Sequence, residues 1–427
     1  MTQRLLDPDL AEAARRLILT CRISSAEDPV RYRVVLRGRR EITDFFRTEL
    51  GWTLHIHDVG GLVRLHKRRD DVPGDRGPRL QRRSGRGELA PAQVLVLAAL
   101  VCEQLWRRPR ISLRELLQSV AQVCAAETAT GRLPAFRIVA TDGVSKREAQ
   151  AARANIVDAI KLLQVDGEIG VDADLDRAVT DENAEVFITA DRDSLANKFA
   201  SLSPTLLSLS DRAPSQHVAA LTAVSLPDDE PEAGAQRQAS VEGRRLTALR
   251  RVVDDPAADP EDDPNPVGYL ATSTGRERAL NIAAALGLVV SVRRDWWEIT
   301  DPTGTASDFD FPQGRKTERQ GALALLSHLP HHGTPEVAAG EITTLFEEIR
   351  RDMPRWAAGY AEQLPVLARA AAAELVTAGL LRVTSDEDRW QITPGVHLWR
   401  VRARQGQPAR PGRHRAEADS DTRKEPA

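Results

Sequence analysis

One pattern recurs along this chain and constrains its fold more than any other feature: a helix that stops at a glycine and leads directly into a two-stranded hairpin. The first copy stops at Gly51, and its strands alternate apolar and polar residues on either side of the turn at 58–61. Further copies stop at Gly167, Gly287 and Gly379. Four copies predict an internal repeat of small helix-and-hairpin units.

Three predicted helices precede the first hairpin. A helix over residues 8–21 follows the cap Asp7, a second over 29–36 follows Asp28, and the third stops at Gly51. Three helices that lead into a hairpin have the order of a winged helix, in which the third helix and the wing usually face nucleic acid. The predicted fold class is therefore α+β, predominantly α, with tandem winged-helix units and short β-hairpin wings.

The same order returns in the rest of the chain. Capping boxes at Ser112 and Ser145 open two helices of a second unit, and the later hairpins share the strand endings Trp-Glu-Ile-Thr at 297–300 and Trp-Gln-Ile-Thr at 390–393. The predicted organisation is winged-helix unit 1 (1–72), a basic linker (73–89), winged-helix unit 2 (90–194), a linker with an acidic segment (195–242), winged-helix-like unit 3 (243–312), winged-helix-like unit 4 (313–400) and an Arg-rich tail expected to be disordered (401–427).

Charge is segregated along the chain, although the formal net charge is only −3. Basic residues outnumber acids twelve to five over 61–110, whereas acids outnumber basic residues ten to two over 166–193. A second acidic segment, 227–264, is rich in Pro and Ala, and this composition indicates a solvated loop or linker. The segregation predicts one face for DNA and another for protein contacts.

Basic side chains of the third helix and of two wings are the candidates for contact with double-stranded DNA, because they could neutralise phosphates. The alternative interpretation is an ordinary solvated edge. The candidates are Arg39, Arg40 and Arg47 on the helix, Arg64, Lys67, Arg68 and Arg69 on the first wing, and Arg293 and Arg294 at the third.

Acids and histidines suggest little chemistry of their own. Asp172, Asp174 and Asp176 imitate the start of a calcium loop but lack its later glycine and glutamate, so a solvated wing tip is the better interpretation. The pair Asp308 and Asp310 could hold magnesium in a nuclease, and the histidines near 330 could bind zinc, yet surface loops explain both. The chain has no Gly-rich phosphate loop. We expect no enzymatic activity, no metal and no cofactor.

Cysteines and apolar runs indicate the compartment. Cys21, Cys102 and Cys124 are scattered without ligand spacing and suggest reduced thiols in a cytoplasmic protein. The longest apolar run, 94–102, has nine residues, far fewer than the roughly 20 of a membrane helix. We therefore expect no contact with a membrane.

Two segments resemble a known bacterial family. They are residues 41–65, with the helix end Phe-Arg-Thr-Glu-Leu-Gly-Trp, and residues 269–329, with Gly-Arg-Glu-Arg-Ala-Leu before the third hairpin. In order and length, most of the chain resembles the MukE-like subunit of type II Wadjet anti-plasmid systems, which is a KITE (kleisin-interacting tandem winged-helix element) protein. The acidic segment 227–264 and the Arg-rich tail match no part of known role.

This resemblance implies a non-enzymatic subunit that forms a homodimer and binds a MukF-like kleisin. It implies further that the subunit helps an SMC-like ATPase to hold and extrude DNA, while a separate Toprim nuclease subunit cleaves circular plasmids. The family offers no catalytic residue to carry over. Two other hypotheses remain: a stand-alone winged-helix transcriptional regulator, and a metal-dependent nuclease that uses Asp308 and Asp310.

Overall fold

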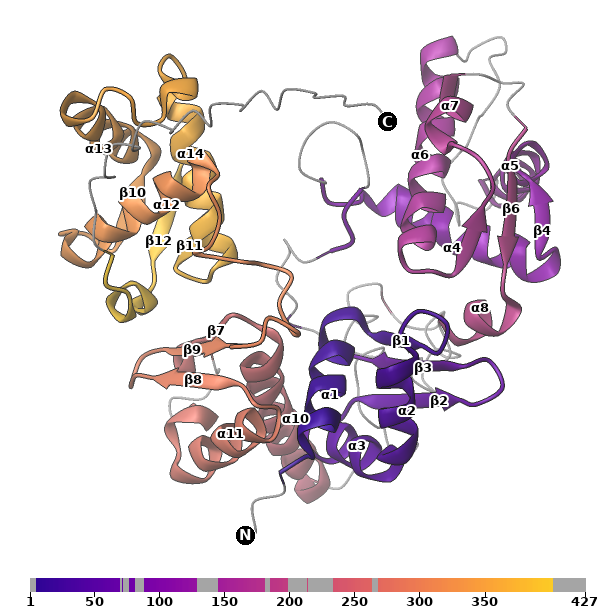
Figure 1. Cartoon of the computed structure of the whole chain (residues 1–427), viewed down its shortest axis with the longest axis horizontal. Helices are drawn as coiled ribbons and strands as arrows, with labels where there is room; N and C mark the ends of the chain where they lie inside the picture. Colours follow the sequence, from indigo (N-terminus) through magenta and orange to yellow (C-terminus); the bar gives the residue numbers. More distant parts are fainter. Residues whose placement is uncertain are drawn as a thin grey trace, which may run out of the picture. The chain divides into compact units, whose positions relative to one another are not determined.

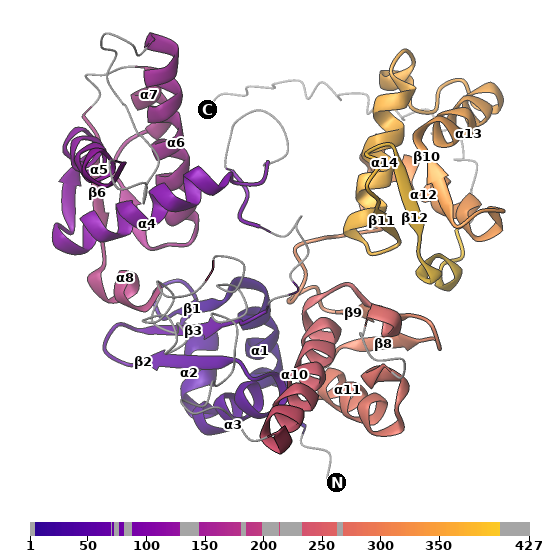
Figure 2. The same ribbon diagram turned by 180° about the vertical axis from the view of Figure 1, so that it is seen from behind.

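The computed structural model describes residues 5–69, 71, 77–80, 88–128, 145–180, 185–198, 213, 233–262 and 268–401. The protein is a mixed α/β structure in which each small three-stranded antiparallel sheet lies beside a group of helices (Figures 1 and 2). It divides into two compact units, Met1–Asp308 and Phe309–Ala427. Three copies of one arrangement, repeats 1 to 3, lie in the first unit, and repeat 4 lies in the second.

Repeat 1 (residues 8–66) begins as the sequence predicts. Asp7 accepts a hydrogen bond from the backbone of Asp9, and Gly51 ends the third helix with a φ of +60°. The elements are α1 (Pro8–Thr20), β1 (Arg22–Ser24), α2 (Pro29–Arg37), α3 (Arg39–Phe45) with the π-turn η1 (Phe46–Leu50), β2 (Thr53–His57) and β3 (Leu62–His66). The strand that the sequence did not predict, β1, pairs with β3, so the sheet has the order β1-β3-β2.

Repeats 2 and 4 have the same topology. Repeat 2 (92–190) comprises α4 (Ala92–Arg107), β4 (Arg110–Ser112), α5 (Leu113–Thr128), α6 (Lys146–Val165), β5 (Ile169–Val171), α7 (Leu175–Thr180) and β6 (Phe187–Ala190), and α8 (Arg192–Lys198) follows it. Repeat 4 (317–392) comprises α12 (Thr317–His328), η6 (Leu329–His331), β10 (Glu336–Ala338), α13 (Ala339–Asp352), η7 (Ala358–Tyr360), α14 (Leu364–Thr377), β11 (Leu381–Val383) and β12 (Arg389–Ile392), and η8 (Pro394–Leu398) follows it. Both capping boxes predicted in repeat 2 form.

Repeat 3 (233–300) is shorter. It comprises α10 (Ala233–Asp254), β7 (Ala257–Ala258), the 3-10 turns η4 (Pro260–Asp262) and η5 (Tyr269–Ala271), α11 (Ser273–Ala285), β8 (Val289–Val292) and β9 (Trp297–Thr300). Among its described residues, short turns stand where the other repeats have their second helix. The first strand again pairs with the return strand of the hairpin, which gives the order β7-β9-β8.

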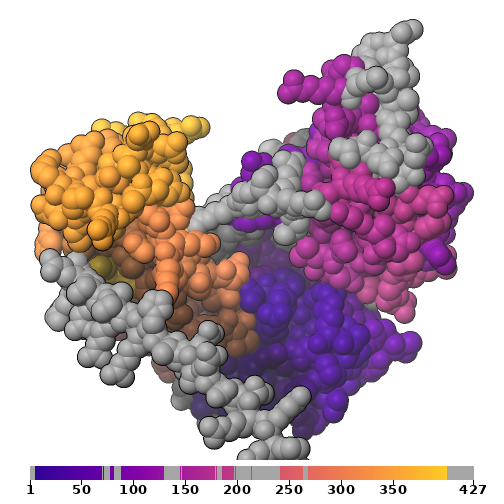
Figure 3. Space-filling model, turned by 45° about the horizontal axis from the view of Figure 1, so that its top comes forward, coloured from indigo at the N-terminus to yellow at the C-terminus, as the bar shows by residue number. Residues whose placement is uncertain are grey.

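Repeats 1 and 3 share one hydrophobic core. Leu17, Phe46 and Trp52 of repeat 1 are buried in the same cluster as Leu249 and Trp297 of repeat 3. The indigo atoms of repeat 1 adjoin those of repeat 3 in the space-filling view (Figure 3). Repeats 2 and 4 each have a core of their own. Two of the four repeats therefore fold as one body.

The interpretation of the acidic segment 227–264 as a loop is wrong for most of its described part. Helix α10 runs through it to Asp254, because Leu246, Leu249 and Val252 recur at helical spacing and are buried against repeat 1. The predicted Arg-rich tail lies almost wholly outside the described residues, as do most of the two predicted linkers. Among the helices that the structure describes, none has both the length and the apolar character needed to cross a membrane.

Candidate functional site

The first wing does not present the basic edge that the sequence predicts. Arg64 on β3 is only 8% exposed and forms an ion pair with Glu168 of repeat 2, which is 1% exposed. The prediction of a solvent-facing phosphate contact is therefore wrong for Arg64. The alternation along β3 does place it on the polar face of the hairpin, but repeat 2 provides a buried carboxylate against that face.

Two acids at the end of α10, Asp254 and Asp255, neutralise the end of the first wing. Lys67 Nζ lies 2.6 Å from Asp254 Oδ1, and Arg69 Nη1 lies 2.8 Å from Asp255 Oδ1. Arg69 is also buried and bonds to Asp71. Burial opposes the charge on Arg69, but Asp255 and Asp71 outweigh it and raise the pKa of the guanidinium. Arg69 is thus a buried ion-pair residue, which corrects its prediction as a DNA contact.

The other wing candidates differ in exposure. Arg68 is half-buried, and Arg293 Nε lies 3.1 Å from Asp295 Oδ1 of its own turn. Arg294 is exposed. The structure does not bring Arg293 and Arg294 into one cluster with the first wing, because they belong to the hairpin of repeat 3.

Exposed arginines do gather where α2 meets α3. The Arg40 side chain is 97% exposed, and Arg39 pairs with Asp58 of the wing turn. Arg47 is exposed beside Asp44 but lies further along, in η1. Sequence reasoning missed two further residues of α2, which the helical spacing of four puts on one face. The basic corner, as we name it, consists of Arg33, Arg37, Arg39 and Arg40.

The basic corner keeps an excess of positive charge. Arg33 and Arg37 are exposed and have no acidic partner within the described part of the chain. Arg40 lies 3.9 Å from Asp44, at the outer limit of an ion pair. These side chains can therefore reach phosphates without first breaking a buried contact, unlike Arg64 and Arg69.

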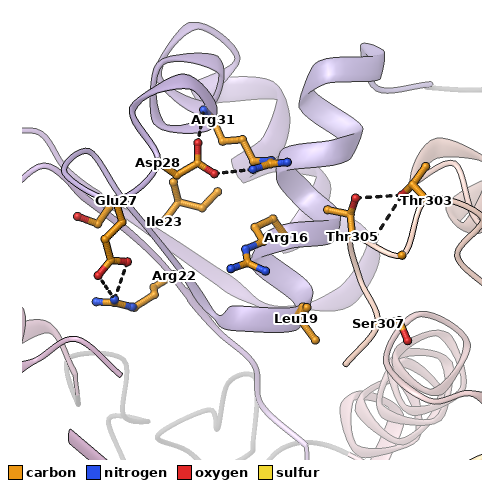
Figure 4. Close-up of a pocket in the computed structure, with 12 residues that line it drawn as sticks. Arg16, Leu19, Arg22, Ile23, Glu27, Asp28, Arg31, Thr303, Thr305 and Ser307 are labelled. Atoms are coloured by element: carbon orange, nitrogen blue, oxygen red, sulfur yellow. Dashed lines mark hydrogen bonds and ion pairs between the residues drawn. The ribbon is translucent and has the colours of Figure 1, made fainter. Parts of the chain in front are cut away.

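A polar pocket of about 410 Å³ lies between repeat 1 and the loop that follows β9 (Figure 4). Arg31 Nη1 lies 2.6 Å from Asp28 Oδ2, and Arg22 Nη2 lies 2.6 Å from Glu27 Oε1. The third arginine, Arg16, is exposed and forms no ion pair among the described residues, although its charge helps to lower the pKa of Asp28. The lining residues are Arg16, Leu19, Arg22, Ile23, Ser24, Glu27, Asp28, Arg31, Thr303, Gly304, Thr305 and Ser307.

Asp301 organises the loop on the far side of this pocket. Its carboxylate accepts hydrogen bonds from the backbone and hydroxyl of Thr303 and from the backbone of Ala306. Burial acts to raise the pKa of Asp301, but these bonds and nearby Arg15 lower it overall. The loop is thereby held with the hydroxyls of Thr303 and Thr305 3.0 Å apart at the pocket.

The remaining candidates are engaged elsewhere. Asp176 pairs with Lys161, and Asp310 pairs with Arg319, which also bonds to buried Glu374. Burial raises the pKa of the Cys102 thiol to about 11. Within the described ranges, no group of three or more His, Cys, Asp or Glu side chains is arranged to hold a metal ion.

Comparison with known proteins places the chain in one family. No curated protein matches it. A family model matches residues 14–402, which is nearly the whole chain and includes parts of all four repeats. The chain therefore belongs to the family described as Protein of unknown function (DUF2398).

Proposed function

We propose that the chain is a non-catalytic, DNA-associated scaffold subunit of the MukE-like KITE class, built from winged-helix repeats. In this proposal it binds a kleisin-like partner and works with an SMC-like ATPase and a Toprim nuclease subunit in plasmid defence. The observation that carries the proposal is the recurrence of one topology four times in a single chain.

The topology supports a winged helix in each repeat. In repeats 1, 2 and 4 a helix, a short strand and two more helices lead into a hairpin, and the short strand pairs with the hairpin's return strand. Repeat 3 has the same strand order, but among its described residues short 3-10 turns replace the second helix. In a winged helix the third helix and the wing meet nucleic acid, so in repeat 1 these parts are α3 and the β2–β3 hairpin.

The basic corner supports association with DNA. Arg39 and Arg40 begin α3, and Arg33 and Arg37 lie just before it on α2. Arginines that contact phosphates position a protein on DNA without reading its sequence. Such binding suits a subunit that holds any plasmid.

The shared core of repeats 1 and 3 supports a scaffold role. Residues far apart in the chain, such as Leu17 and Leu249, are buried in one cluster. A rigid pair of repeats offers a fixed surface to a partner, and the acids of repeat 2, including Asp172 and Asp174, suit protein contact better than DNA contact.

A binding experiment separates this proposal from the transcriptional regulator. Fluorescence anisotropy with duplexes of unrelated sequence is measured over a salt series, alongside a duplex from the protein's own promoter. The proposal predicts equal affinities that fall steeply with salt, because phosphate contacts release counterions. Clear preference for the promoter, with protection of a defined site in a footprint, contradicts the proposal and supports the regulator.

A further inference from the structure

Repeats 1 and 3 contact each other through a reciprocal pair of arginines. Arg15 of α1 donates a hydrogen bond to the carbonyl oxygen of Leu286, at the end of α11. Arg250 of α10 donates in the opposite direction, with its Nε 2.7 Å from the carbonyl oxygen of Leu50. Each accepting carbonyl stands immediately before a glycine of positive φ that ends a helix.

Strand register shows that the two arginines are equivalent. Arg15 stands seven residues before the first residue of β1, and Arg250 stands seven before the first residue of β7. The pairing within the two sheets gives the same alignment. Arg22 pairs with Arg64, which stands two residues before the end of β3, and Ala257 pairs with Glu298, which stands two residues before the end of β9. Repeats 1 and 3 therefore meet as the two halves of an isologous dimer do.

The same alignment matches the arginine that follows in each repeat, so Arg16 corresponds to Arg251. It also shows which residue of repeat 3 corresponds to Asp71, the ion-pair partner of Arg251. His66 and Thr300 correspond because each pairs with the first residue of the preceding strand. Five residues further on, Asp71 of repeat 1 therefore corresponds to Thr305 of repeat 3.

One of the two equivalent positions is closed by a carboxylate and the other is open. Arg251 Nε lies 2.6 Å from Asp71 Oδ2, and this carboxylate also binds Arg69. At the equivalent position, Arg16 faces Thr305, which has a hydroxyl in place of the carboxylate of Asp71; the carboxylate of Asp28, whose pKa Arg16 lowers, is bound to Arg31 (Figure 4). The pocket of about 410 Å³ therefore has a threonine hydroxyl beside Arg16 where repeat 1 has a carboxylate beside Arg251.

We propose that this pocket binds the phosphate group of a small ligand, with Arg16 as its principal charged contact. The hydroxyl of Thr305, which lies 3.0 Å from the Thr303 hydroxyl, turns to donate to a phosphate oxygen from the opposite side, while the Thr303 hydroxyl keeps its hydrogen bond to Asp301. Gly304 has a φ of +71°, and a methyl group on its Cα would meet no atom within 4 Å, so the backbone there is open to a ligand.

Phosphate fits this lining better than other anions or a whole nucleotide base. Its tetrahedral oxygens can accept from the N–H groups of an arginine and from the Thr305 hydroxyl at once, whereas a planar carboxylate has only two oxygens. Arg31 pairs with Glu12 as well as Asp28, and Arg22 pairs with Glu27, so Arg16 is the lining arginine that forms no ion pair among the described residues. The lining contains no aromatic ring on which a base could stack. This proposal goes beyond DNA association and does not depend on it.

Calorimetric titration of the full chain with magnesium-free pyrophosphate tests the proposal. We expect a dissociation constant of about 1 mM or tighter at low salt. Arg16→Ala should weaken binding at least about tenfold, because charge-assisted hydrogen bonds are lost. Thr305→Asp should abolish it by supplying the carboxylate that Asp71 supplies in repeat 1. Arg351→Ala is the matched control, since it removes an exposed arginine of repeat 4, outside both the pocket and the basic corner.

Thr305→Asp leaves Arg16 in place, and thermal melts confirm that each variant is folded.

Duplex DNA, added as a competitor, distinguishes the source of the phosphate: displacement of pyrophosphate indicates the DNA backbone, and no displacement indicates a free phosphate compound. Both results support the site. The proposal is overturned if the native chain does not bind pyrophosphate, or if both pocket variants bind it as the native chain does. Arg16-dependent binding of poly-glutamate without binding of pyrophosphate also overturns it.

Discussion

Arg64 on β3 and Glu168, the residue before β5, form a buried ion pair between positions 104 apart in the sequence. Lys198 Nζ also lies 3.6 Å from Glu168 Oε1. The pair joins the wing of repeat 1 to the hairpin of repeat 2. Both side chains are buried away from solvent, so each charge is stabilised by the opposite charge of its partner.

Replacement of Glu168 by Gln should destabilise the protein strongly. It leaves the charge of buried Arg64 without its carboxylate, and the expected loss is about 3 kcal/mol in the free energy of unfolding. Urea denaturation measures it. The control is Asp58→Asn, which removes an exposed partner of Arg39 and should cost less than about 1 kcal/mol. Equal losses in the two variants would contradict a special role for the buried pair.

Gly287→Ala should cost more than Gly304→Ala, although both glycines have a positive φ, of +67° and +71°. A methyl group at Gly287 would stand 2.6 Å from Arg15 Nη1, whereas nothing lies within 4 Å at Gly304. We expect about 1 kcal/mol for backbone strain at Gly304. The loss at Gly287 should exceed it by about 1 to 3 kcal/mol, because buried Arg15 is displaced from its carbonyl acceptor. Urea unfolding of both variants tests this, and indistinguishable losses would refute it.

His66 should make stability depend on pH. Burial, followed by His55, Arg64 and other neighbours, lowers the pKa of His66 from 6.5 to about 4. The unfolded chain therefore binds a proton between pH 6.5 and about 4 that the folded chain does not bind, so stability falls as pH falls through this window. The expected loss is about 2 kcal/mol after allowance for residual solvent exposure.

The test compares the free energy of unfolding at the two ends of this window. His66→Gln should remove that part of the pH dependence, while His397→Gln, which replaces an exposed histidine, should leave it unchanged. An unchanged slope in His66→Gln would show that other groups cause the acid sensitivity.

Much of the fold could be predicted because its signals are local. Asp7 caps α1, the buried Leu10 and Leu17 lie on one helical face, and Gly51 ends the third helix as its position indicates. Strands β1 and β10 were missed because three residues are too few to show an alternating pattern. They become strands only by pairing with a hairpin that lies far along the chain.

The candidate site was harder to predict because exposure is decided by tertiary contacts. Lys67 and Arg69 form a basic run in the sequence, yet Asp254 and Asp255, more than 180 residues away, neutralise them. Asp254 itself lies in a segment of loop-like composition, which becomes helical because Leu249 and its neighbours are buried by repeat 1. The spacing of Arg33 and Arg37 was a usable signal, since it places both on one face of α2.

Removal of the basic corner should weaken DNA binding about equally for all sequences. The triple variant Arg33→Ala/Arg37→Ala/Arg40→Ala should reduce the slope of log affinity against log salt by about one for each lost phosphate contact. The matched control, Arg351→Ala/Arg355→Ala, removes exposed arginines of repeat 4. Anisotropy titrations over a salt series measure the slopes. A slope unchanged in the triple variant would place the DNA contacts on another surface.

The composition of the complex that this chain forms in its host tests the proposed scaffold role most directly. The chain is tagged, purified under mild salt and analysed by size exclusion and mass spectrometry, with an unrelated tagged protein as control. The proposal predicts that a kleisin-like protein and an SMC-like ATPase elute together with the chain. Elution as a monomer, free of both partners, would contradict it.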